Sequence, residues 1–583
     1  MAPAPEPNFP ALLDVRADKQ GNEVVYIWLG DDGDALAQLT FAELRRRALA
    51  VAAALAARVS AGQRALIVLP QGLEFLVTFF GCLYAGVVPV PVTLPNRKRG
   101  LDIVRAIAVD SGARLLLSTS PTLQQLLTDS DEDALSALQA LDISSCRDED
   151  AAFVARRADP DDVALLQYTS GSTRSPHGVA VTHANLCANH RQVAACLDSD
   201  SSSVYVSWLP MFHDMGLGIA LQAIWVGVRC VLLSPRAFFQ EPLRWLRAIS
   251  RYRGTTSGGP NSAFALCLQR ISRAEREQLD LSSWRVAFNG SEPVHTATLE
   301  RFAEVFADVG FRRTALHPVY GLAEATLLAA SEPPRQGPVV RYFSAAALEQ
   351  NRATAEDAPD SGPVRALVSC GRPWPGTEIA IVDPLSRSEA EPGRAGEIWI
   401  RGASVARGYW NRASETRVTF GLSTADGRGG FMRSGDIGAI ADGRLFVLGR
   451  QSDILRINGR SHYPHDIETV SSTSHVALLP HACAAVLAPL QGVESLVIIQ
   501  EVSRSALRGL NPAAVTSAIR RAVAEHHQLV VHAVVLLKPA TLPRTTSGKV
   551  RRAHARAAFL EQSLAAVDIW LEPLFEPRPL SAL

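Results

Sequence analysis

One lysine near the end of the chain has the residue type and surroundings of a catalytic cation. Residues 543–549 read Pro-Arg-Thr-Thr-Ser-Gly-Lys. The 58 lysines and arginines include just four lysines, Lys19, Lys98, Lys538 and Lys549. Lysine carries a compact charge on a flexible stem, whereas arginine is a planar fork. A lysine kept in a Ser-Gly turn therefore predicts a group that contacts a carboxylate and a phosphate oxygen together. A surface lysine in a polar turn is the alternative.

A segment rich in hydroxyls and glycine follows an apolar stretch that predicts a strand over residues 162–166. Residues 167–179 read Gln-Tyr-Thr-Ser-Gly-Ser-Thr-Arg-Ser-Pro-His-Gly-Val. Backbone N–H groups and hydroxyls in such a loop can surround phosphate oxygens, although the pattern differs from the Gly-x-x-x-x-Gly-Lys-Ser/Thr loop. The run Thr-His-Ala-Asn-Leu at 182–186 then predicts a capped helix start. This order favours a phosphate loop over a flexible linker.

Three polar residues allow both a chemical and a structural interpretation. His213 and the adjacent Asp214 could act together as the base of a hydrolytic enzyme, but no Gly-x-Ser-x-Gly motif accompanies them. A buried core histidine is the alternative. Glu324 opens a predicted helix, where it could cap the first turn or hold a metal–phosphate pair. Asp436 follows Gly435, so an ordinary turn aspartate competes with a carboxylate that accepts two ribose hydroxyls.

The composition limits the possible partners. A chain of 583 residues is long enough for at least two domains and a buried ligand pocket. The 58 basic residues balance the 58 acidic ones, which argues against nucleic acid or an acidic membrane surface as a bulk partner. The eight scattered cysteines form no Cys-x-x-Cys pair and the first residues show no signal-peptide pattern, so we expect a reducing cytoplasm.

The elements that must position these residues alternate between helical and strand patterns. Helical spacing over 41–59 precedes an apolar strand over 64–70, and a helix over 103–110 precedes a strand over 114–117. Such alternation predicts parallel sheets covered by helices. The uncharged stretch over 75–92 contains glycines and prolines, so it predicts a buried helix ending at Gly86 and then a strand, rather than a membrane span.

The texture of the chain changes near residue 393. Glycine-bounded apolar runs at 396–402 and 443–449 predict a small β-rich subdomain. A boundary is expected near 450–453, because the chain beyond it has its own helical and strand patterns, at 513–525 and 530–537. This last part is long enough to fold as a lid.

Six segments resemble, in order, the motifs of the adenylate-forming superfamily, which includes acyl-CoA synthetases, peptide-synthetase adenylation domains and luciferases. They are the phosphate loop at 167–179, the adenine-binding turn at 289–293, a tyrosine–glutamate segment at 320–326, the ribose-binding aspartate at 434–436, the hinge at 449–453 and the catalytic-lysine loop at 543–549. Each motif alone is weak. Six in the family's order make coincidence a poor explanation.

Further details resemble one branch, the fatty acyl-AMP ligases. The similar segments are 208–217 (Trp-Leu-Pro-Met-Phe-His-Asp-Met-Gly-Leu), 310–320 and 459–468. The polar stretch over 332–363, with a possible short helix at 345–350, predicts an insertion or long loop rather than a core element. In that branch an insertion, here about 341–365, is thought to restrict lid movement and to disfavour chemistry on coenzyme A.

The resemblance implies an α/β adenylate-forming fold. A large N-terminal adenylation domain over 1–450 would hold two α/β sheets and a β-rich subdomain, and a small mobile α+β lid would occupy 451–583. The implied reaction uses ATP and Mg²⁺ to convert a medium- or long-chain fatty acid into acyl-AMP and pyrophosphate. The acyl group would then pass to a phosphopantetheine on a separate acyl carrier protein, in a polyketide synthase or peptide synthetase system, since no carrier motif occurs in this chain.

The resemblance also implies roles for individual residues. The catalytic group is Lys549, Glu324 and His213, with Glu324 also at the metal and Asp453 as the hinge. The nucleotide-binding group is Thr169, Ser170, Gly171, Ser172, Thr173, Gly290, Ser291, Glu292, Tyr320, Gly321, Leu322, Asp436 and Arg450. The acyl-tunnel group is Trp208, Met215, Gly258, Pro260 and Phe264.

The phosphate loop departs from the pattern of the superfamily. Where Thr-Gly-x-Pro-Lys-Gly is usual, residues 173–178 read Thr-Arg-Ser-Pro-His-Gly, so His177 replaces a lysine and Arg174 a glycine. The change weakens charge support for pyrophosphate, which Arg174 could restore. Two rival functions remain open. An acyl-CoA ligase would share every catalytic motif, and a non-catalytic lipid- or nucleotide-binding relative would not need the lysine, glutamate and aspartate that this chain retains.

Overall fold

The computed structural model describes residues 8–95, 98–128, 135, 137–146, 153–169, 176–356, 364–457, 460–490, 493–545 and 549–572. Packing divides the chain into two compact units, of which the first is Met1–Tyr342 with Ala366–Val447 and the second is Phe343–Arg365 with Leu448–Leu583. The boundary at Val447 lies close to the expected one at 450. The segment expected as an insertion of the first domain belongs to the second unit.

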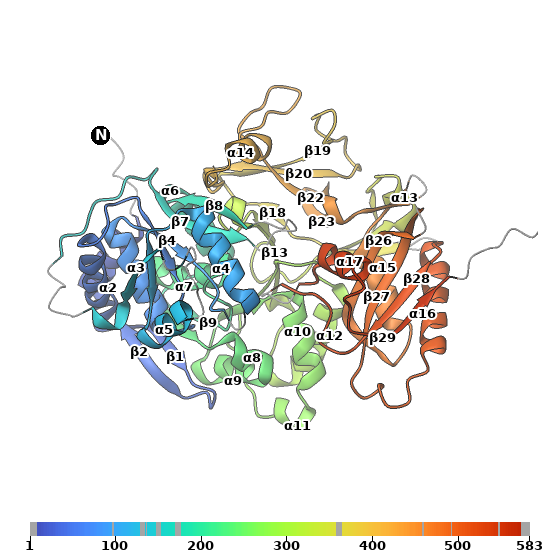
Figure 1. The fold of residues 1–583 in the computed structure, drawn as a ribbon, viewed down its shortest axis with the longest axis horizontal. Helices are drawn as coiled ribbons and strands as arrows, with labels where there is room; N and C mark the ends of the chain where they lie inside the picture. Colours follow the sequence, from blue (N-terminus) through green and yellow to red (C-terminus); the bar gives the residue numbers. More distant parts are fainter. Residues whose placement is uncertain are drawn as a thin grey trace, which may run out of the picture. The chain divides into compact units, whose positions relative to one another are not determined.

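A nine-stranded sheet is the largest sheet of the first unit (Figure 1). Its order is β18-β14-β13-β12-β11-β9-β10-β1-β2, and the strands from β13 to β1 run parallel. The bounds are β1 Val24–Leu29, β2 Ala35–Thr40, β9 Val204–Ser207, β10 Arg229–Leu232, β11 Thr256–Gly259, β12 Val286–Asn289, β13 Leu316–Tyr320, β14 Ala330–Ser331 and β18 Arg372–Pro373. Helices α7 (Asp214–Val226), α9 (Leu243–Tyr252), α10 (Asn261–Arg270) and α12 (Thr296–Phe306) connect the parallel strands.

The connections reverse direction between strands β9 and β11. From β9 the chain passes through α7 to β10 on one side, whereas from β11 it passes through α10 to β12 on the other. In open parallel sheets, ligands bind at the carboxyl ends of strands where this reversal occurs. Trp208 follows β9 and Pro260 follows β11, so the fold predicts a ligand site beside these two residues.

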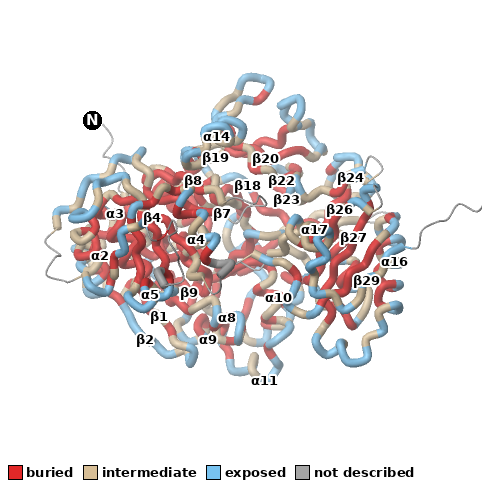
Figure 2. The backbone as a smooth tube through the Cα atoms, viewed as in Figure 1, coloured by how far each residue is buried: buried red, intermediate tan, exposed pale blue. Residues whose placement is uncertain are grey.

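A second parallel sheet, β4-β3-β5-β6, completes the two α/β sheets expected for this unit. Its elements are α2 Phe41–Ala56, β3 Arg64–Ile67, α3 Leu73–Ala85, β4 Val88–Pro91, α4 Lys98–Ser111, β5 Leu115–Ser118, α5 Ser120–Thr128 and β6 Gln139–Asp142. Every residue of helix α3 except Glu74 is buried (Figure 2), and the helix ends at Gly86, whose φ of +67° favours glycine. Within the described ranges, no helix is long and apolar enough to cross a membrane.

Two antiparallel sheets make up the rest of the first unit. One is β21-β8-β7, with β7 Val163–Thr169, β8 His177–Thr182 and β21 Gly408–Tyr409. The other is the expected β-rich part, β19-β20-β22-β23, with β19 Thr377–Val382, β20 Gly396–Gly402, β22 Met432–Ala441 and β23 Arg444–Arg450. Helix α6 (His183–Cys196) begins where the sequence predicts. The Thr182 side chain accepts a hydrogen bond from the Asn185 N–H, and the Asn185 side chain accepts one from the Thr182 N–H.

The second unit is a small α+β structure. Its sheet has the order β26-β27-β28-β29, with β26 Leu478–Leu490, β27 Val493–Val502, β28 Ala533–Leu537 and β29 Ala566–Leu571. Helix α16 (Pro512–His527) connects β27 to β28, which pair in parallel. Helices α15 (Pro464–Thr473) and α16 share one apolar cluster with the sheet, and Ala555 of α17 (Arg552–Leu560) belongs to a second cluster.

The segment before residue 365 has more regular structure than a long loop, and the short helix expected at 345–350 is present. It contains β15 (Val340–Ser344), α13 (Ala345–Glu349) and β16 (Ala355–Glu356), and a three-stranded sheet has the order β16-β15-β17, with β17 at Val364–Val368. Phe343 and Leu348 are buried. The strands, unlike the helix, were not expected, because apolar side chains are widely spaced in this polar segment.

Ionic contacts hold this segment within the second unit. Arg365 Nε lies 2.9 Å from Asp466 Oδ1, Arg365 Nη2 donates to the Leu448 carbonyl at 2.9 Å, and the guanidinium lies over the Tyr463 ring at 4.8 Å. Burial raises the pKa of Asp466 above its usual value; Arg365 opposes the shift and Glu468 adds to it. We call Arg365, Tyr463 and Asp466 the segment clasp.

Candidate active site

The carboxyl edge of the nine-stranded sheet gathers most of the residues singled out in the sequence. Trp208 follows β9, Pro260 follows β11, Gly290 follows β12 and Tyr320 ends β13. These positions are spread between residues 208 and 320, and parallel pairing aligns their strands at one edge. The same edge therefore carries Gly258, Ser291, Glu292, Gly321, Leu322 and Glu324.

Tyr320 and Asp436 are brought together from two different sheets. The Tyr320 hydroxyl donates to Asp436 Oδ2 at 2.8 Å, and both side chains are buried. Asp436 lies inside strand β22, where its backbone N–H also donates to Ser434 Oγ at 3.0 Å. The interpretation of Asp436 as an ordinary turn aspartate is therefore wrong. Its carboxylate is held beside the edge by a defined partner.

At three positions of this edge, neighbouring atoms lie so close to the backbone that only glycine fits. A Cβ on Gly290 would lie 2.7 Å from Val319 Cγ2, one on Gly321 would lie 1.7 Å from the Leu327 carbonyl oxygen, and one on Gly258 would lie 2.0 Å from the Phe288 carbonyl oxygen. Side chains at these positions would force the strands and turns apart. Ser291, next to Gly290, has a φ of +73°, an uncommon conformation for a residue other than glycine.

Two buried polar side chains at this edge make no hydrogen bond with any residue that the structure describes. Both amide atoms of Asn289, at the end of β12, and the indole Nε1 of Trp208 are buried without a protein partner. Unsatisfied buried groups cost about 1–3 kcal/mol each, and native proteins rarely leave them so. A polar ligand at the edge would satisfy them.

Glu324 is oriented by a tyrosine that sequence reasoning missed. The Tyr409 hydroxyl donates to Glu324 Oε1 at 2.9 Å, and the Ala406 N–H donates to the Glu324 carbonyl at 2.9 Å. Glu324 lies in a 3₁₀ turn, Ala323–Ala325, rather than at the start of a long helix. Because Tyr409 pairs with Val179 of β8, the carboxylate is tied to the hairpin that carries the predicted phosphate loop.

His177 also has a partner that the sequence did not reveal. Its Nε2 lies 3.0 Å from Glu415 Oε2, and its ring centroid lies 5.4 Å from that of Tyr409. Glu415 belongs to helix α14 (Ala413–Thr419) and also accepts from Arg412 at 3.0 Å. Thr169 ends strand β7. The other predicted loop residues, Ser170, Gly171, Ser172 and Thr173, lie outside the described residues, as does Arg174.

His213 stands at the N-cap of helix α7, with Asp214 as the first helical residue. Its ring lies 4.7 Å from that of Phe212, and the Phe212 carbonyl accepts from Gln167 Nε2 at 2.9 Å. This contact ties the start of α7 to strand β7, just before the predicted phosphate loop. The position suits a residue at the wall of a site on the first unit.

The residues assigned to an acyl tunnel form packed structure. Trp208 stacks on Phe238 at 3.8 Å, and Gly259 admits this ring because a Cβ there would lie 2.9 Å from Trp208 Cζ2. Phe264 is fully buried and meets Trp245 at 5.6 Å. Met215 lies in the first turn of α7 and is partly buried. The tunnel assignment stays a prediction.

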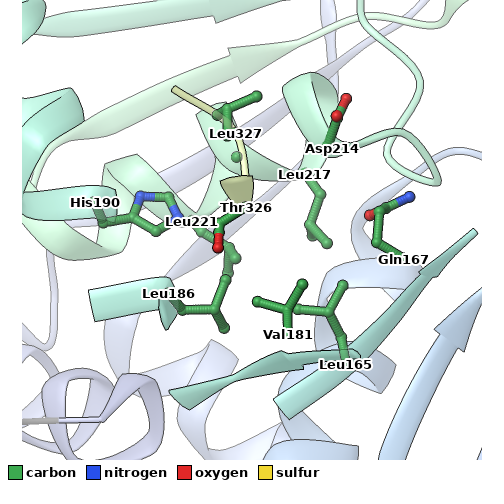
Figure 3. Close-up of a pocket in the computed structure, with 11 residues that line it drawn as sticks. Leu165, Gln167, Val181, Leu186, His190, Asp214, Leu217, Leu221, Thr326 and Leu327 are labelled. Atoms are coloured by element: carbon green, nitrogen blue, oxygen red, sulfur yellow. The ribbon is translucent and has the colours of Figure 1, made fainter. Parts of the chain in front are cut away.

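A cavity of about 20 Å³ lies behind the start of α7. Figure 3 shows apolar side chains around it, with Asp214 and Gln167 on one side and His190 on another. The lining is Leu165, Gln167, Val181, Leu186, His190, Asp214, Leu217, Gly218, Leu221, Thr326 and Leu327. A space of this size holds about one water molecule, so it is far too small for a fatty chain.

Lys549, Arg450 and Asp453 belong to the second unit. The Lys549 carbonyl accepts from the Thr545 N–H at 2.7 Å, and the Lys549 N–H donates to Thr545 Oγ1 at 3.0 Å. These bonds join the two described residues on either side of residues 546–548, which lie outside the described residues. Arg450 ends β23 and is exposed, and Asp453 ends the 3₁₀ turn Gln451–Asp453.

The comparison with protein families decides the identity of this fold. The model of the AMP-binding enzyme family matches residues 13–410, more than half of the chain. The chain belongs to the AMP-binding enzyme family. A second model, the AMP domain of Disco-interacting protein 2-like proteins, matches residues 452–568.

Relatives within the AMP-binding enzyme family match this chain over nearly its whole length. It is 41% identical over 578 residues, 97% of each chain, to JamA of Moorena producens, a medium-chain-fatty-acid–[acyl-carrier-protein] ligase. It is 36% identical to the long-chain-fatty-acid–AMP ligase FadD23 of Mycobacterium tuberculosis, covering 96% of this chain and 98% of that one. The fatty acyl-adenylate ligase of Legionella pneumophila, in complex with acyl adenylate and pyrophosphate, is 34% identical with a TM-score of 0.74, covering 97% and 98% of the two chains. The resemblance to fatty acyl-AMP ligases and the adenylate-forming fold are confirmed.

The motifs of the AMP-binding enzyme family predicted which residues lie at the carboxyl edge of the sheet. They did not predict the side chains that contact the site residues. Tyr409, Glu415 and Arg552 make defined contacts with Glu324, His177 and Asp453, respectively. No spacing in the sequence connects these pairs. Arg552 is the one with a signal, since it stands three residues after the retained lysine.

Proposed function

We propose that this protein is a fatty acyl-AMP ligase that activates a medium- or long-chain fatty acid with ATP and passes the acyl group to the phosphopantetheine of a separate acyl carrier protein. The observation that carries the proposal is the Tyr320–Asp436 pair at the carboxyl edge of a parallel sheet. Full-length similarity to JamA, whose name includes both the medium-chain fatty acid and the carrier protein, supports it.

The nucleoside would be held by the edge residues. Asp436 would accept the ribose hydroxyls, with Arg450 as a second ribose contact, because a carboxylate fixed by a tyrosine offers two oriented acceptors. The turn at Gly290, Ser291 and Glu292 would bind adenine through its backbone, since Gly290 leaves no room for a side chain. The unsatisfied amide of Asn289 supports a polar heterocycle there.

The triphosphate would need neutralisation. Thr169 and the loop that follows would donate to its oxygens. Magnesium in nucleotide sites is held by one or two carboxylates together with substrate phosphates and water, and the oriented carboxylate of Glu324 fits that donor set. When bound, the ion would offset charge on the β- and γ-phosphates.

The first chemical step would be a displacement at phosphorus. A carboxylate oxygen of the fatty acid attacks the α-phosphorus of ATP, a P–O bond forms to it, and the bond to the β-phosphate breaks with pyrophosphate as the leaving group. Positioning of the two substrates and neutralisation of the phosphate charge can catalyse such a reaction without a covalent enzyme nucleophile. Lys549 would neutralise the carboxylate and the α-phosphate, and His213 would form the wall beside the carboxylate.

The second step would be acyl transfer. The phosphopantetheine thiolate attacks the acyl carbon, and the C–O bond to AMP breaks with AMP as the leaving group. The thiol proton passes to solvent. We propose that the carrier belongs to a polyketide synthase or peptide synthetase system and that the reaction takes place in the cytoplasm, where the eight reduced cysteines of this chain would persist.

Product analysis tests this function. Purified protein is incubated with ATP, Mg²⁺ and a medium-chain fatty acid, with and without coenzyme A. Acyl-AMP that persists in the presence of coenzyme A is expected. Acyl-CoA as the main product would instead identify a CoA ligase, and the absence of both products over a series of chain lengths would favour a non-catalytic relative.

Replacement of Lys549 by alanine tests the proposed role of the lysine. Adenylation is expected to fall by at least about a thousandfold, because removing a preorganised charge from a developing transition state costs several kcal/mol. ATP binding should stay within a few fold, measured by calorimetry. Lys538→Ala is the matched control, and unchanged turnover in the Lys549 variant would refute the assignment.

A further inference from the structure

A buried glutamate in the β-rich part of the first unit is explained by none of the motifs. Glu397 is the second residue of β20, and its side chain is fully buried. Trp399, on the same face of the strand, belongs to an apolar cluster with Phe431. Burial of a carboxylate in such surroundings is costly unless donors surround it. The contacts of Glu397 therefore show what this residue is for.

Four donor groups lie around the Glu397 carboxylate. Arg433 Nε donates to Oε1 at 2.9 Å, and Arg433 Nη2 lies 2.8 Å from Oε2. The indole Nε1 of Trp399 donates to Oε2 at 3.1 Å. These side chains fix the plane of the carboxylate, because a two-point arginine contact and an indole allow little rotation. The fourth donor is a backbone group, the Gly435 N–H, which lies 3.2 Å from Oε1.

A bulge in β22 contains this backbone group and the carboxylate that we propose to hold the ribose. The pairing of β20 with β22 shifts register between Glu397 and Trp399. Across the shift, one residue of β20, Ile398, lies opposite three residues of β22, 434–436. Gly435, in the middle of the three, has a φ of +72°, which favours glycine. Bulges beside active sites commonly redirect a side chain.

Two side chains hold the backbone of this bulge. Ser434 Oγ donates to a carbonyl of β20 at 2.8 Å and accepts from the Asp436 N–H at 3.0 Å. Glu397 accepts from the N–H of Gly435, the residue before Asp436. The Asp436 side chain then meets the Tyr320 hydroxyl at 2.8 Å. The direction of the Asp436 carboxylate therefore depends on where Glu397 holds the preceding residue.

We propose that Glu397 is a positioning residue that fixes the bulge of β22 and thereby orients the Asp436 carboxylate toward the ribose of ATP. The inference rests on the proposed ribose contact of Asp436. A buried ion pair that serves stability alone can often be replaced by packed apolar side chains without loss. Glu397 has a further role, because an apolar side chain could not accept the Gly435 N–H.

Binding of two nucleotides separates orientation of the ribose carboxylate from general stabilisation. Calorimetry compares ATP with 2′,3′-dideoxy-ATP, which lacks both ribose hydroxyls, in wild-type protein and in Glu397→Gln. The amide keeps the size of the side chain but lacks the charge and one of the two acceptor oxygens. Kd for ATP is expected to rise about tenfold. Kd for dideoxy-ATP should stay within twofold, because the weakened contact is to the hydroxyls that this nucleotide lacks.

Two further variants support the comparison. Arg433→Lys leaves Glu397 in place and replaces the two-point contact with one ammonium. We expect a rise of about threefold in Kd for ATP and no change for dideoxy-ATP, so this variant provides the test if Glu397→Gln does not fold. Glu378→Gln is the matched control, since Glu378 of β19 in the same sheet accepts from Arg401 Nε at 2.7 Å. It should change neither Kd.

Equal rises in Kd for the two nucleotides would overturn the inference and leave Glu397 as a structural residue, and so would unchanged binding of ATP. Wild-type protein that binds both nucleotides equally, or neither, would instead refute the ribose contact proposed for Asp436. Hydrogen exchange then still decides whether Glu397 fixes the bulge. The N–H groups of Gly435 and Asp436 should exchange at least about tenfold faster in Glu397→Gln than in wild type, and unchanged exchange would exclude that hold.

Discussion

The Tyr320 hydroxyl donates a hydrogen bond to Asp436 Oδ2 across 2.8 Å, and both side chains are buried. The pair joins the end of β13 in the large parallel sheet to the middle of β22 in an antiparallel one. The position of the carboxylate is therefore set by a residue at the carboxyl edge itself. This relationship fixes the carboxylate that we propose to hold the ribose.

Tyr320→Phe should weaken nucleotide binding. The variant keeps the ring but leaves a buried carboxylate without this donor, and hydrogen bonds to charged groups contribute about 1.5–3 kcal/mol. We expect KM for ATP to rise about tenfold with KM for the fatty acid unchanged. Tyr26→Phe is the matched control, since its hydroxyl donates to the Ala220 carbonyl at 2.8 Å in the same unit. Equal ATP kinetics for the two variants would contradict a nucleotide role.

His177→Ala should also raise KM for ATP, by about three- to tenfold. The variant loses the contact with Glu415 at 3.0 Å and the ring beside Tyr409, so the stem of the predicted phosphate loop is less well held. His177→Lys supplies a cation that can keep the Glu415 contact and should stay within about threefold of wild type. Pyrophosphate release from the three proteins at a series of ATP concentrations provides the measurement. A lysine variant as weak as the alanine variant would show that the imidazole itself is required.

Arg365→Ala should destabilise the second unit. It removes the charge opposite Asp466 and the group over Tyr463, in a pair whose side chains are 12% and 26% exposed. Breaking such a partly buried pair is expected to cost about 2 kcal/mol. Asp466→Asn should cost less, because burial already raises the pKa of that carboxyl and disfavours its charge. Urea unfolding measures both losses.

Arg520→Ala is the control for the segment clasp. Its guanidinium lies 4.0 Å from the centre of the Trp570 ring within the same unit. We expect a loss of about 1 kcal/mol for this half-buried cation–π contact. A loss as large as that of Arg365→Ala would show that any arginine of the unit matters equally, and the clasp would have no special role.

Stability of the first unit should fall on acidification below about pH 6.5. Burial lowers the pKa of His190 and of His317 to about 4, whereas unfolded histidine has a pKa of about 6.5. Between these values the unfolded chain binds protons that the folded chain does not. Each histidine then removes up to about 1.4 kcal/mol per pH unit. Urea unfolding at several pH values between 7.5 and 4.5 measures the slope.

His190→Gln isolates one of these contributions. His190 Nδ1 lies 2.6 Å from Gln222 Oε1, and an amide can replace this contact without a titrating group. As the pH falls, the free energy of unfolding of the variant should decrease less steeply than that of wild type. The difference in slope corresponds to the one proton that unfolded His190 binds. Parallel pH profiles for the two proteins would mean that His190 is not the titrating group.

Features of the fold that depend on residues close together in the chain can be predicted from the sequence. The start of α6 follows from Thr182 and Asn185, which cap the helix reciprocally. The end of α3 follows from Gly86, which adopts a positive φ. Spacing of apolar residues likewise predicts the strands on both sides of α3. In each case the deciding interaction spans a few residues, so local propensity and pattern contain it.

Partners from distant segments could not be predicted. Glu415 meets His177, and Asp466 meets Arg365, only after separate elements pack together. Asp436 has the local sequence of a turn but lies inside β22, where the pairing with β20 shifts register and Gly435 has a φ of +72°. The order of the site residues was visible in the sequence, whereas the side chains that hold them were not.

All eight cysteines are thiols, and seven of them are buried, with Cys146 half-buried. Burial raises the pKa of the Cys82, Cys230 and Cys267 thiols well above the usual value, so little thiolate is available to alkylating reagents. Spin or fluorescent labels that react with thiols should therefore attach poorly to these native cysteines. With Cys146 changed to serine, one new cysteine at exposed Val418 of the first unit and one at exposed Glu525 of the second would report the distance between the units through a full reaction cycle.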